Sequence, residues 1–369
     1  MKELRIKDIC DKGSSNLKQK DVESKNGLYP VYGASGIISY IDTYHQEANY
    51  IAIVKDGSGI GRVSFMPAKS SVIGTMQYIL PKEGFNINYI GYCLQSLDLS
   101  KYKQGAAIPH IYFRDYGERI VKVTEDIIEQ QSIVDYLDSA FAKIDAMRAN
   151  AEKALGEAKA LFQASLKEML EPKEGWEEKK LGDLATDMYR GSGIRRDQVT
   201  KEGTPCVRYG EIYTTYNVGF DTCVSHTKEE YISSPKYFEH GDLLFAITGE
   251  SVEDIGKTIA YLGNEKCLCG GDIICMKHNQ NPKFLAYALT TPEAIRQKGM
   301  GKTKLKVVHT NAPALKGIII PVPSLSEQQS IVATLDSLKS KVDRLQENYE
   351  KISQECDALK QAILRQVFE

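Results

Sequence analysis

Long apolar runs, dense cysteine and a strong net charge are all missing from this 369-residue chain. No stretch of about 18 consecutive apolar residues occurs, so the sequence does not predict a transmembrane helix. The first residues contain no apolar core of a signal peptide, and 8 cysteines are too few for a disulfide scaffold. We therefore expect a globular, reduced, cytoplasmic protein.

The net charge is only −2, but the charge is unevenly distributed along the chain. Residues 125–178 include 13 acidic and 6 basic residues, and residues 324–369 include 8 acidic and 6 basic residues. The rest of the chain carries 35 basic and 28 acidic residues. Two net-positive regions therefore alternate with two acidic regions, and the small overall charge does not exclude a nucleic-acid partner.

Catalytic signatures are absent as well. The two Gly-Lys-Thr tripeptides, at 256–258 and 301–303, lack the preceding glycine that a phosphate-binding loop requires. The segment 281–284 (Asn-Pro-Lys-Phe) lacks the second proline of adenine methyltransferases, and no glycine-rich cofactor loop precedes it. No Ser/His/Asp or Cys/His set is recognisable. We therefore predict a binding protein that is not an enzyme.

A compact group of thiols and one imidazole raises the question of zinc. It consists of Cys267, Cys269, Cys275 and His278. Structural zinc sites usually contain Cys-x₂-Cys pairs, which this group lacks, so small buried thiols are the preferred interpretation. We expect no metal site in this chain.

A duplicated segment organises the sequence. The word Glu-Gln-Gln-Ser-Ile-Val occurs at 129–134 and again, 198 residues later, at 327–332. Further matches follow at the same offset as far as Gln-Ala at 163–164, whereas the segments before each copy agree only in outline. The order predicts a variable lobe at 1–124, a constant segment at 125–174, a second lobe at 175–323 and a second constant segment at 324–369.

Both constant segments repeat apolar residues with the 3.5-residue period of a coiled coil. About 42 helical residues at roughly 1.5 Å each would form a helix near 60 Å long. The predicted inward positions are Ile133, Leu137, Ile144 and Leu161 in the first segment, and Ile331, Leu335, Val342, Leu345, Ile352 and Leu359 in the second. We expect the two helices to pack on each other. The alternative is that each lies along its own lobe as an ordinary amphipathic helix.

Each lobe contains short apolar runs typical of strands and longer runs typical of helices. The strand runs are 50–54, 63–66, 76–80, 242–247 and 272–276, and the helical runs are 88–97 and 282–290. The predicted fold class is α/β (α+β): two globular lobes separated by two long antiparallel coiled-coil helices, with an internal pseudo-twofold repeat.

Basic and polar side chains gather at comparable points of the two lobes. In the first lobe they are Lys101, Lys103, Gln104 and His110, with Lys55, Ser58 and Arg62 on a glycine-rich loop. In the second lobe they are Arg190, Arg195, Arg196, Arg208, Lys302 and Lys304, with Glu250 and Ser251 on the loop that matches 57–59. Such residues contact phosphates and hydrogen-bond base edges. We predict one DNA-binding surface on each lobe; a solvated charged face is the alternative for any single run.

The duplicated Glu-Gln-Gln-Ser-Ile-Val helix start, each copy preceded by an Ile/Val-rich strand, resembles the specificity (S) subunit of type I restriction–modification systems. Residues 321–329 are the more typical copy, whereas 123–131 lacks its prolines, and 176–184 at the start of the second lobe is also similar. The resemblance implies two target-recognition domains, each reading one half of a split site in double-stranded DNA. It also implies that the paired helices space these domains and dock two methyltransferase (modification) subunits.

The same resemblance assigns the chemistry to other subunits. The partner methyltransferases would bind S-adenosylmethionine, and the restriction/translocase subunits would use ATP and magnesium, so this chain would hold no cofactor. The two half-sites would lie about one helical turn, ~34 Å, apart. The alternative function is a non-enzymatic coiled-coil scaffold that joins protein partners through two adaptor lobes.

Overall fold

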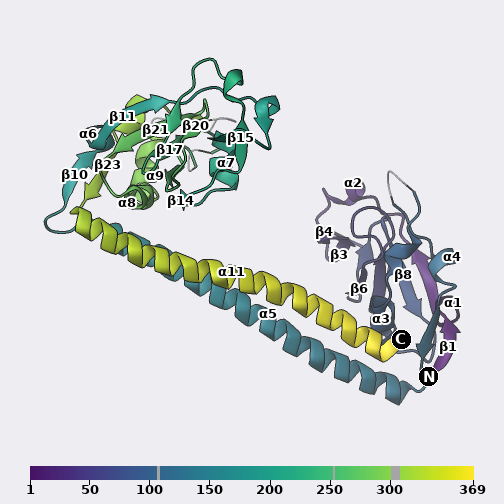
Figure 1. The fold of residues 1–369 in the computed structure, drawn as a ribbon. Helices are drawn as coiled ribbons and strands as arrows, with labels where there is room; N and C mark the ends of the chain where they lie inside the picture. The colour runs from purple at the N-terminus through teal and green to yellow at the C-terminus, as the bar shows by residue number, and fades with distance from the viewer. Residues whose placement is uncertain (106–108, 252–253, 301–307) are drawn as a thin grey trace. The chain divides into compact units, whose positions relative to one another are not determined.

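The computed structural model describes residues 1–105, 109–251, 254–300 and 308–369 and divides into two compact units. Unit 1 comprises Met1–Lys153 and Glu347–Glu369, and unit 2 comprises Ala154–Gln346. Each unit contains one lobe and part of both long helices, α5 (Ile127–Leu170) and α11 (Leu325–Phe368) (Figure 1). None of the helices in the described part of the chain combines the length and apolarity needed to cross a membrane.

The lobe of unit 1, called lobe one, is built on a four-stranded sheet of order β2-β8-β5-β6, against which α3 packs. A three-stranded sheet, β4-β3-β7, lies in the same lobe, and β1 pairs with β9. Its elements are β1 (Lys2–Arg5), α1 (Ile6–Ile9), β2 (Cys10–Ser14), α2 (Gln19–Val22), β3 (Tyr29–Gly33), β4 (Gly36–Ile41), β5 (Tyr50–Val54), β6 (Val63–Met66), β7 (Ser71–Val72), β8 (Met76–Pro81), α3 (Ile87–Ser96), η1 (Leu99–Tyr102), α4 (Phe113–Tyr116) and β9 (Ile120–Val123).

The lobe of unit 2, called lobe two, repeats this plan with additional strands. Its sheets have the orders β11-β21-β17-β19-β14 and β12-β15-β13-β20-β16, and β10 pairs with β23 as β1 pairs with β9. Its elements are β10 (Glu177–Lys180), α6 (Leu181–Leu184), β11 (Ala185–Arg190), η2 (Arg196–Gln198), β12 (Val199–Thr200), β13 (Thr204–Val207), α7 (Tyr209–Thr214), β14 (Gly219–Phe220), β15 (Ser225–Thr227), η3 (Glu229–Tyr231), β16 (Tyr237–Phe238), β17 (Leu243–Ala246), β18 (Thr248–Gly249), β19 (Thr258–Tyr261), β20 (Cys267–Cys269), β21 (Ile273–His278), α8 (Pro282–Ala288), α9 (Pro292–Gly299), β22 (Val308–His309), α10 (Ala312–Lys316) and β23 (Ile319–Val322).

The central strand of each lobe is buried on both faces. In β5, Ile51 and Ile53 belong to one core cluster, whereas Tyr50, Ala52 and Val54 belong to another. In β17, Leu243 and Phe245 are likewise separated from Leu244 and Ala246. Burial on both faces explains why these strands read as continuous apolar runs instead of alternating ones. The predicted strands and helices of both lobes are confirmed, with ends that differ by at most two residues.

The two long helices pair in antiparallel fashion within each unit. In unit 1, Lys360 Nζ lies 2.6 Å from Asp145 Oδ1, and Arg148 contacts Asp357 and donates to the Ser353 carbonyl at 3.0 Å. In unit 2, Lys159 Nζ donates to Gln346 Oε1 at 2.7 Å. At the 198-residue offset, Lys159 and Gln346 are the equivalents of Asp357 and Arg148. The internal repeat of the sequence is therefore also a repeat of helix contacts.

The predicted contact stripe on α5 is wrong at Leu161. Leu137 and Ile144 are buried as expected, but Leu161 is 60% exposed, and the buried apolar positions include Leu155 and Phe162 instead. The shift arises because the polar Arg148 occupies an inward position, which an apolar pattern cannot reveal, and because Phe162 packs into the core of lobe two.

On α11 the predicted stripe holds as far as Ile352 and then shifts by one residue at Leu359. Ile331, Leu335 and Val342 are buried, and Leu345 and Ile352 are half-buried, as Ile133 is on α5. Leu359 is exposed, which corrects the prediction. The adjacent Lys360 takes its place, because its amine lies over the Phe141 ring, 5.4 Å from the ring centre, and donates to Asp145.

Leucine-to-alanine substitutions on α5 test this correction. Leu137→Ala should lower the free energy of unfolding of unit 1 by about 2–5 kcal/mol, because it opens a cavity in the core. Leu161→Ala removes the same atoms from an exposed position and should change stability by less than about 0.5 kcal/mol. Urea unfolding of the two variants measures the difference. Equal losses of unfolding free energy in the two variants would indicate that Leu161 is an inward position after all.

The first glutamine of the repeated Glu-Gln-Gln sequence makes equivalent buried hydrogen bonds in both units. Gln130 is fully buried; its Oε1 accepts from Asn86 N at 2.6 Å, and its Nε2 donates to the Gly84 and Thr124 carbonyls. Gln328 is fully buried too, accepts from Asn281 N at 2.9 Å and donates to the Pro323 carbonyl. Each glutamine thereby joins the start of its long helix to the start of α3 or α8.

Candidate nucleic-acid interface

The predicted residues of lobe one lie around the hairpin that joins β5 to β6. The backbone N–H groups of Lys55 and Asp56 both donate to the Thr75 carbonyl, at 3.0 and 3.2 Å. Gly57 N donates to the Pro109 carbonyl at 3.0 Å, and Ile111 N donates to the Lys55 carbonyl at 2.9 Å. These bonds hold the hairpin against the segment that carries the second group of predicted residues.

His110 lies where the two segments meet. Its Nδ1 is 2.6 Å from Asp56 Oδ1, so the ring N–H donates to the carboxylate. His110 and Gln104 exchange two backbone hydrogen bonds of 2.8 Å. Lys101 lies in the adjacent η1, and Lys103 follows it. Backbone bonds thus tie the hairpin to the 104–111 segment that follows η1. We call the seven residues predicted for these two segments the lobe-one edge: Lys55, Ser58, Arg62, Lys101, Lys103, Gln104 and His110.

Arg62 lies at the end of the hairpin between β5 and β6. Its Nη1 donates to the Ala34 carbonyl at 2.9 Å, and a Cβ on Gly59 would meet its guanidinium at 2.9 Å. Gly59 has a φ of 85°, a conformation that favours glycine. The equivalent residue in lobe two is Lys257, whose pKa is lowered by burial, with Asp254 opposing that effect. Sequence reasoning missed Lys257 because the lobe sequences agree only in outline. The equivalence follows from two backbone bonds of 3.0 Å, from Val54 N to the Arg62 carbonyl and from Ala246 N to the Lys257 carbonyl.

In lobe two the hairpin after β17 occupies the equivalent position. Ile247 N donates to the Asp272 carbonyl at 3.0 Å, as Lys55 N does to Thr75 in lobe one. Arg190 Nη2 lies 2.8 Å from Asp272 Oδ1, which places this predicted residue beside the hairpin. β18 pairs with β22, and Thr248 Oγ1 lies 3.1 Å from His309 Nδ1.

The two histidines are equivalent residues of the repeated lobe. Ile111 N bonds the Lys55 carbonyl just after His110, and Thr310 N bonds the Ile247 carbonyl at 2.9 Å just after His309. Each histidine is therefore held by the hairpin residue that faces it, Asp56 in lobe one and Thr248 in lobe two. The fold repeats the position, whereas the partner differs in charge. Two lobes with this difference present unlike hydrogen-bonding groups at the same place.

Arg208 lies at the end of β13 in a region of close backbone approach. Gly270 N donates to the Val207 carbonyl at 2.9 Å, and a Cβ on Gly271 would meet Gly193 Cα at 2.9 Å. Arg208 Nη2 is 3.0 Å from Glu211 Oε1, and that carboxylate is nearly buried. Glu211 therefore fixes the guanidinium, and the Arg208 backbone lies beside Gly270, where an added Cβ would meet Arg208 Cα at 3.2 Å. We call Arg190, Arg208, the hairpin 247–251 and Val308–His309 the lobe-two edge.

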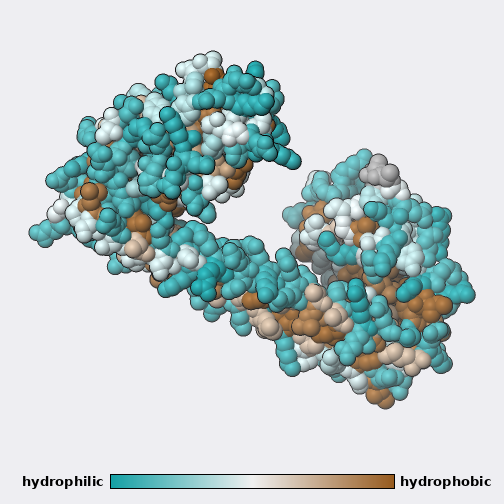
Figure 2. Space-filling model, viewed as in Figure 1, coloured by the Kyte–Doolittle hydropathy of each residue, from teal (hydrophilic) through white to brown (hydrophobic). Residues whose placement is uncertain are grey.

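The other predicted residues of lobe two lie elsewhere or carry local bonds. Arg195 and Arg196 are exposed at η2, which Gln198 ties to the Tyr231 carbonyl. Glu250 is exposed, and the Ser251 hydroxyl bonds Asp254 Oδ2 at 2.7 Å within its own turn. Lys302 and Lys304 lie outside the described residues. On the face shown in Figure 2, hydrophilic residues cover most of lobe two.

The buried Lys298 predicts a pH-dependent stability for lobe two. Its Nζ donates to the Leu289 carbonyl at 2.8 Å and to Thr258 Oγ1 at 3.3 Å, and burial lowers its pKa to about 7 from 10.5. Between these values the unfolded chain binds more protons, so stability should rise with pH from about 7 to 10.5, on the order of 1 kcal/mol per pH unit. Lys298→Met should reduce this slope in urea unfolding at pH 7, 8 and 9. An unchanged slope would contradict the assignment.

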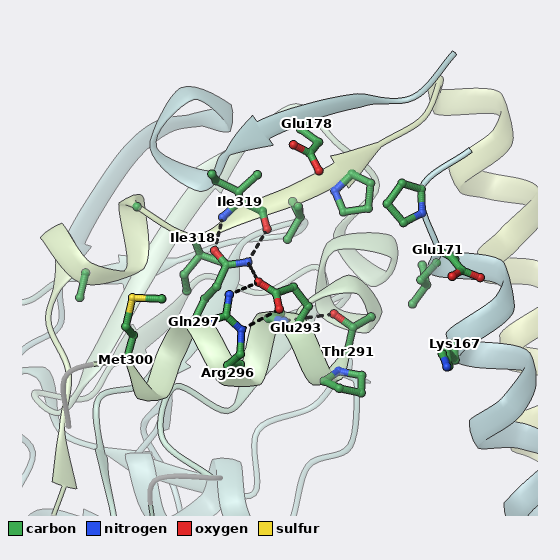
Figure 3. Close-up of a pocket in the computed structure, with 18 of the residues that line it drawn as sticks. Lys167, Glu171, Glu178, Thr291, Glu293, Arg296, Gln297, Met300, Ile318 and Ile319 are labelled. Atoms are coloured by element: carbon green, nitrogen blue, oxygen red, sulfur yellow. Dashed lines mark hydrogen bonds and ion pairs between the residues drawn. The ribbon is translucent and has the colours of Figure 1, made fainter. Parts of the chain in front are cut away.

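A pocket of about 840 Å³ lies in unit 2, away from the lobe-two edge. Its lining is largely apolar, and Figure 3 shows Lys167 of α5, and Glu171 just after the end of α5, across the pocket from α9. On α9, Arg296 makes two hydrogen bonds to Glu293, at 2.7 and 2.8 Å, and Gln297 bonds the Ile319 backbone. Among the described residues of this lining, no hydrogen bond joins a Thr or Lys nucleophile to an acidic side chain, and the Thr291 hydroxyl donates to the Ala288 carbonyl.

All 8 cysteines are buried. Burial raises the pKa of the Cys10 and Cys206 thiols to about 12. Within the described ranges, no three His, Cys, Asp or Glu side chains are arranged to hold a metal ion. Cys267, Cys269 and Cys275 of the predicted group are buried residues of β20 and β21, and His278 at the end of β21 is partly exposed.

Comparison with known proteins gives three kinds of similarity. Residues 1–155 and 173–354 match the family described as the type I restriction modification DNA specificity domain. A protein of Methanocaldococcus jannaschii, provisionally named as the MjaX specificity subunit of a type I restriction enzyme, is 26% identical over 212 residues. That match covers 53% of this chain and 47% of the relative, so the chain spans about half the length of the curated relative.

Two solved structures share the fold over nearly the whole chain. One comes from work on complex assembly and conformational transition of the type I R-M system; it has a TM-score of 0.72, 18% identity, and coverage of 98% of this chain and 96% of its own. The other is the HsdS subunit from Thermoanaerobacter tengcongensis, with a TM-score of 0.55, 17% identity, and coverage of 98% and 95%.

Proposed function

The chain belongs to the type I restriction modification DNA specificity family, and from this premise we propose that it is the subunit that reads a split DNA site for a type I restriction–modification complex. Each lobe would read one half of the site through its own edge. Since the two edges carry different side chains at equivalent positions, the two half-sites would differ in sequence.

The observation that carries this proposal is the repeat of one scaffold around two unlike edges. Gln130 and Gln328 fix each lobe to the start of a long helix in the same way. At the edges, the group facing the histidine is the Asp56 carboxylate in one lobe and the Thr248 hydroxyl in the other. A scaffold that is repeated while its exposed groups change supports recognition of two sequences.

The long helices would dock the two methyltransferase subunits. The inward residues Leu137, Ile331 and Leu335 are buried, so docking would use the outward face instead. In unit 1 that face of α5 exposes Ile128, Tyr136 and Met147 among acidic side chains. Apolar residues on an exposed helix, surrounded by charged ones, suit a partner protein.

The chemistry would belong to the partners. The chain itself would be non-catalytic and would act in the cytoplasm, with S-adenosylmethionine bound by the methyltransferase subunits. ATP and magnesium would serve the restriction/translocase subunits. No step of modification or cleavage would use a residue of this chain.

Selection of DNA fragments by the assembled complex tests the proposal. The chain would be produced together with its methyltransferase partners, and bound fragments from a random DNA library would be sequenced. The expected result is enrichment of two short sequences at a fixed separation. Assembly with the partners but without any enriched sequence would favour the protein scaffold.

A further inference from the structure

Unit 1 contains a polar groove between lobe one and the end of α11. Two adjoining pockets, of about 670 and 310 Å³, share Ser96, Leu97, Asp98 and Arg365. The β5–β6 hairpin forms one wall through residues 59–63, and η1 forms the next. A Cβ on Gly61 would meet Ser100 N at 2.9 Å, so glycine lets the hairpin lie directly on η1. We call the two pockets together the unit-1 groove.

The unit-1 groove is lined by more positive than negative side chains. Four basic residues, Arg62, Lys101, Arg119 and Arg365, compare with two acidic ones, Asp98 and Glu369. Asp98 already caps η1 by accepting from Ser100 N at 3.2 Å. Within the part of the chain that the structure describes, the Arg119 and Arg365 guanidiniums have no hydrogen-bond or ion-pair partner. Their donors are available to an external anion.

The equivalent position in unit 2 shows that the fold does not require these arginines. Ile6 N donates to the Arg119 carbonyl at 3.1 Å, and Leu181 N donates to the Ile318 carbonyl at 2.9 Å, so Ile318 is the equivalent of Arg119. The equivalent of Arg365 is Lys167, at the 198-residue offset. Ile318 is 1% exposed and faces the apolar pocket of unit 2.

The two units also differ in how an acidic residue pairs with the basic residue at the position of Lys101. The position of Lys101 is taken in unit 2 by Arg296, which Glu293 binds with two hydrogen bonds (Figure 3). In unit 1 the Lys101 amine is 3.9 Å from Asp98 and 78% exposed. One scaffold therefore forms a neutralised, apolar pocket in unit 2 and an open cationic groove in unit 1. The positive charge of the unit-1 groove therefore comes from its particular side chains, since the same fold in unit 2 does not require them.

We propose that the unit-1 groove binds the phosphodiester backbone of DNA beside the half-site read by lobe one. This inference rests on the proposed function. The groove is continuous with the lobe-one edge, because its hairpin wall carries Arg62 and the same hairpin carries Lys55 and Ser58. Unpaired guanidiniums bind phosphate oxygens with two parallel N–H donors. Such contacts position a duplex without reading its sequence.

The test is a double variant, Arg119→Gln with Arg365→Gln, in the complex assembled with methyltransferase partners. Fluorescence anisotropy would measure affinity for cognate and unrelated duplexes between about 50 and 200 mM salt. Loss of two phosphate contacts should make the slope of log affinity against log salt shallower by about 1.8. The ratio of affinities at the two salt concentrations should then fall about tenfold, equally for both duplexes.

The controls separate a phosphate contact from loss of structure. Lys351→Gln removes one exposed charge of α11 that is paired with Glu355 in the same unit, and it should leave the slope unchanged. Arg119→Lys with Arg365→Lys should keep most of the slope. Thermal unfolding of the glutamine variant should match that of the parent, because both side chains are exposed and bond none of the described residues.

Three outcomes would overturn the inference. The first is a double variant with the same salt slope as the Lys351→Gln control. The second is a loss of affinity for the cognate duplex alone. The third is normal DNA binding with weaker assembly with the partners, which would assign the groove to an acidic protein surface. Failure of the proposed function is a separate result, since the parent complex would then show no preference for any sequence.

Discussion

The Gln328→Leu variant should unfold about 10 °C below the parent chain in the transition of unit 2. Leucine fills nearly the same volume as glutamine but leaves Asn281 N–H, the Pro323 carbonyl and the Gln280 side chain without their partner. Buried groups left unsatisfied cost about 1–3 kcal/mol each, so the loss of three partners should cost at least about 3 kcal/mol. A unit of this size shifts by roughly 2–4 °C per kcal/mol.

The neighbouring residue of the same word supplies the control. Gln329 is exposed, and Gln329→Leu makes the same chemical change without removing a buried hydrogen bond. Its melting temperature should stay within about 2 °C of the parent. Equal melting temperatures of the two variants would contradict the role of Gln328 in connecting lobe two to α11. Gln130→Leu should produce the corresponding loss in unit 1.

Glutamine substitution of His110 and of His309 should relax different halves of the DNA site. Each histidine is held at the edge of its lobe, by Asp56 in one case and Thr248 in the other. Loss of one base-reading side chain costs about 1–3 kcal/mol of discrimination, or roughly 5- to 150-fold. Competition binding by the assembled complex, with DNA changed in one half-site at a time, measures which half each variant has ceased to read.

His240→Gln is the matched control, since this histidine bonds the Leu262 and Gly263 carbonyls away from the lobe-two edge. It should leave discrimination unchanged in both halves. Relaxation of both halves by a single histidine variant would contradict the assignment of one half-site to each lobe. Uniform weakening on all DNA would instead identify that histidine as a phosphate contact.

The sequence predicted the repeated architecture because its signals are local. The identical words at 129–134 and 327–332 revealed the duplication, and the apolar runs of β5 and β17 marked strands buried on both faces. The burial of Gln130 was not foreseen, although its repetition was the available clue. A polar residue that recurs at equivalent positions of an internal repeat is a candidate for a buried hydrogen-bonded joint.

The helix contacts could be predicted only in part, because a stripe of apolar residues does not show which partner each residue meets. Arg148 lies inward on α5 through its bonds to α11, whereas Leu161 faces outward. Sequence spacing was equally unable to predict which residues meet at the lobe-one edge and in the unit-1 groove. Asp56 and His110 are brought together by sheet topology, and Arg119 and Arg365 by the return of α11 to lobe one. Neither pairing follows from spacing along the chain.

A map of the bases methylated by the assembled complex tests the central claim most directly. The account predicts one motif made of two different short sequences with a gap of fixed length, and a modified base within each half. Replacing the lobe-two edge residues should then change one half of that motif and leave the other half and the gap as they were. A single uninterrupted motif, two identical halves, or simultaneous change in both halves would contradict separate reading by the two lobes.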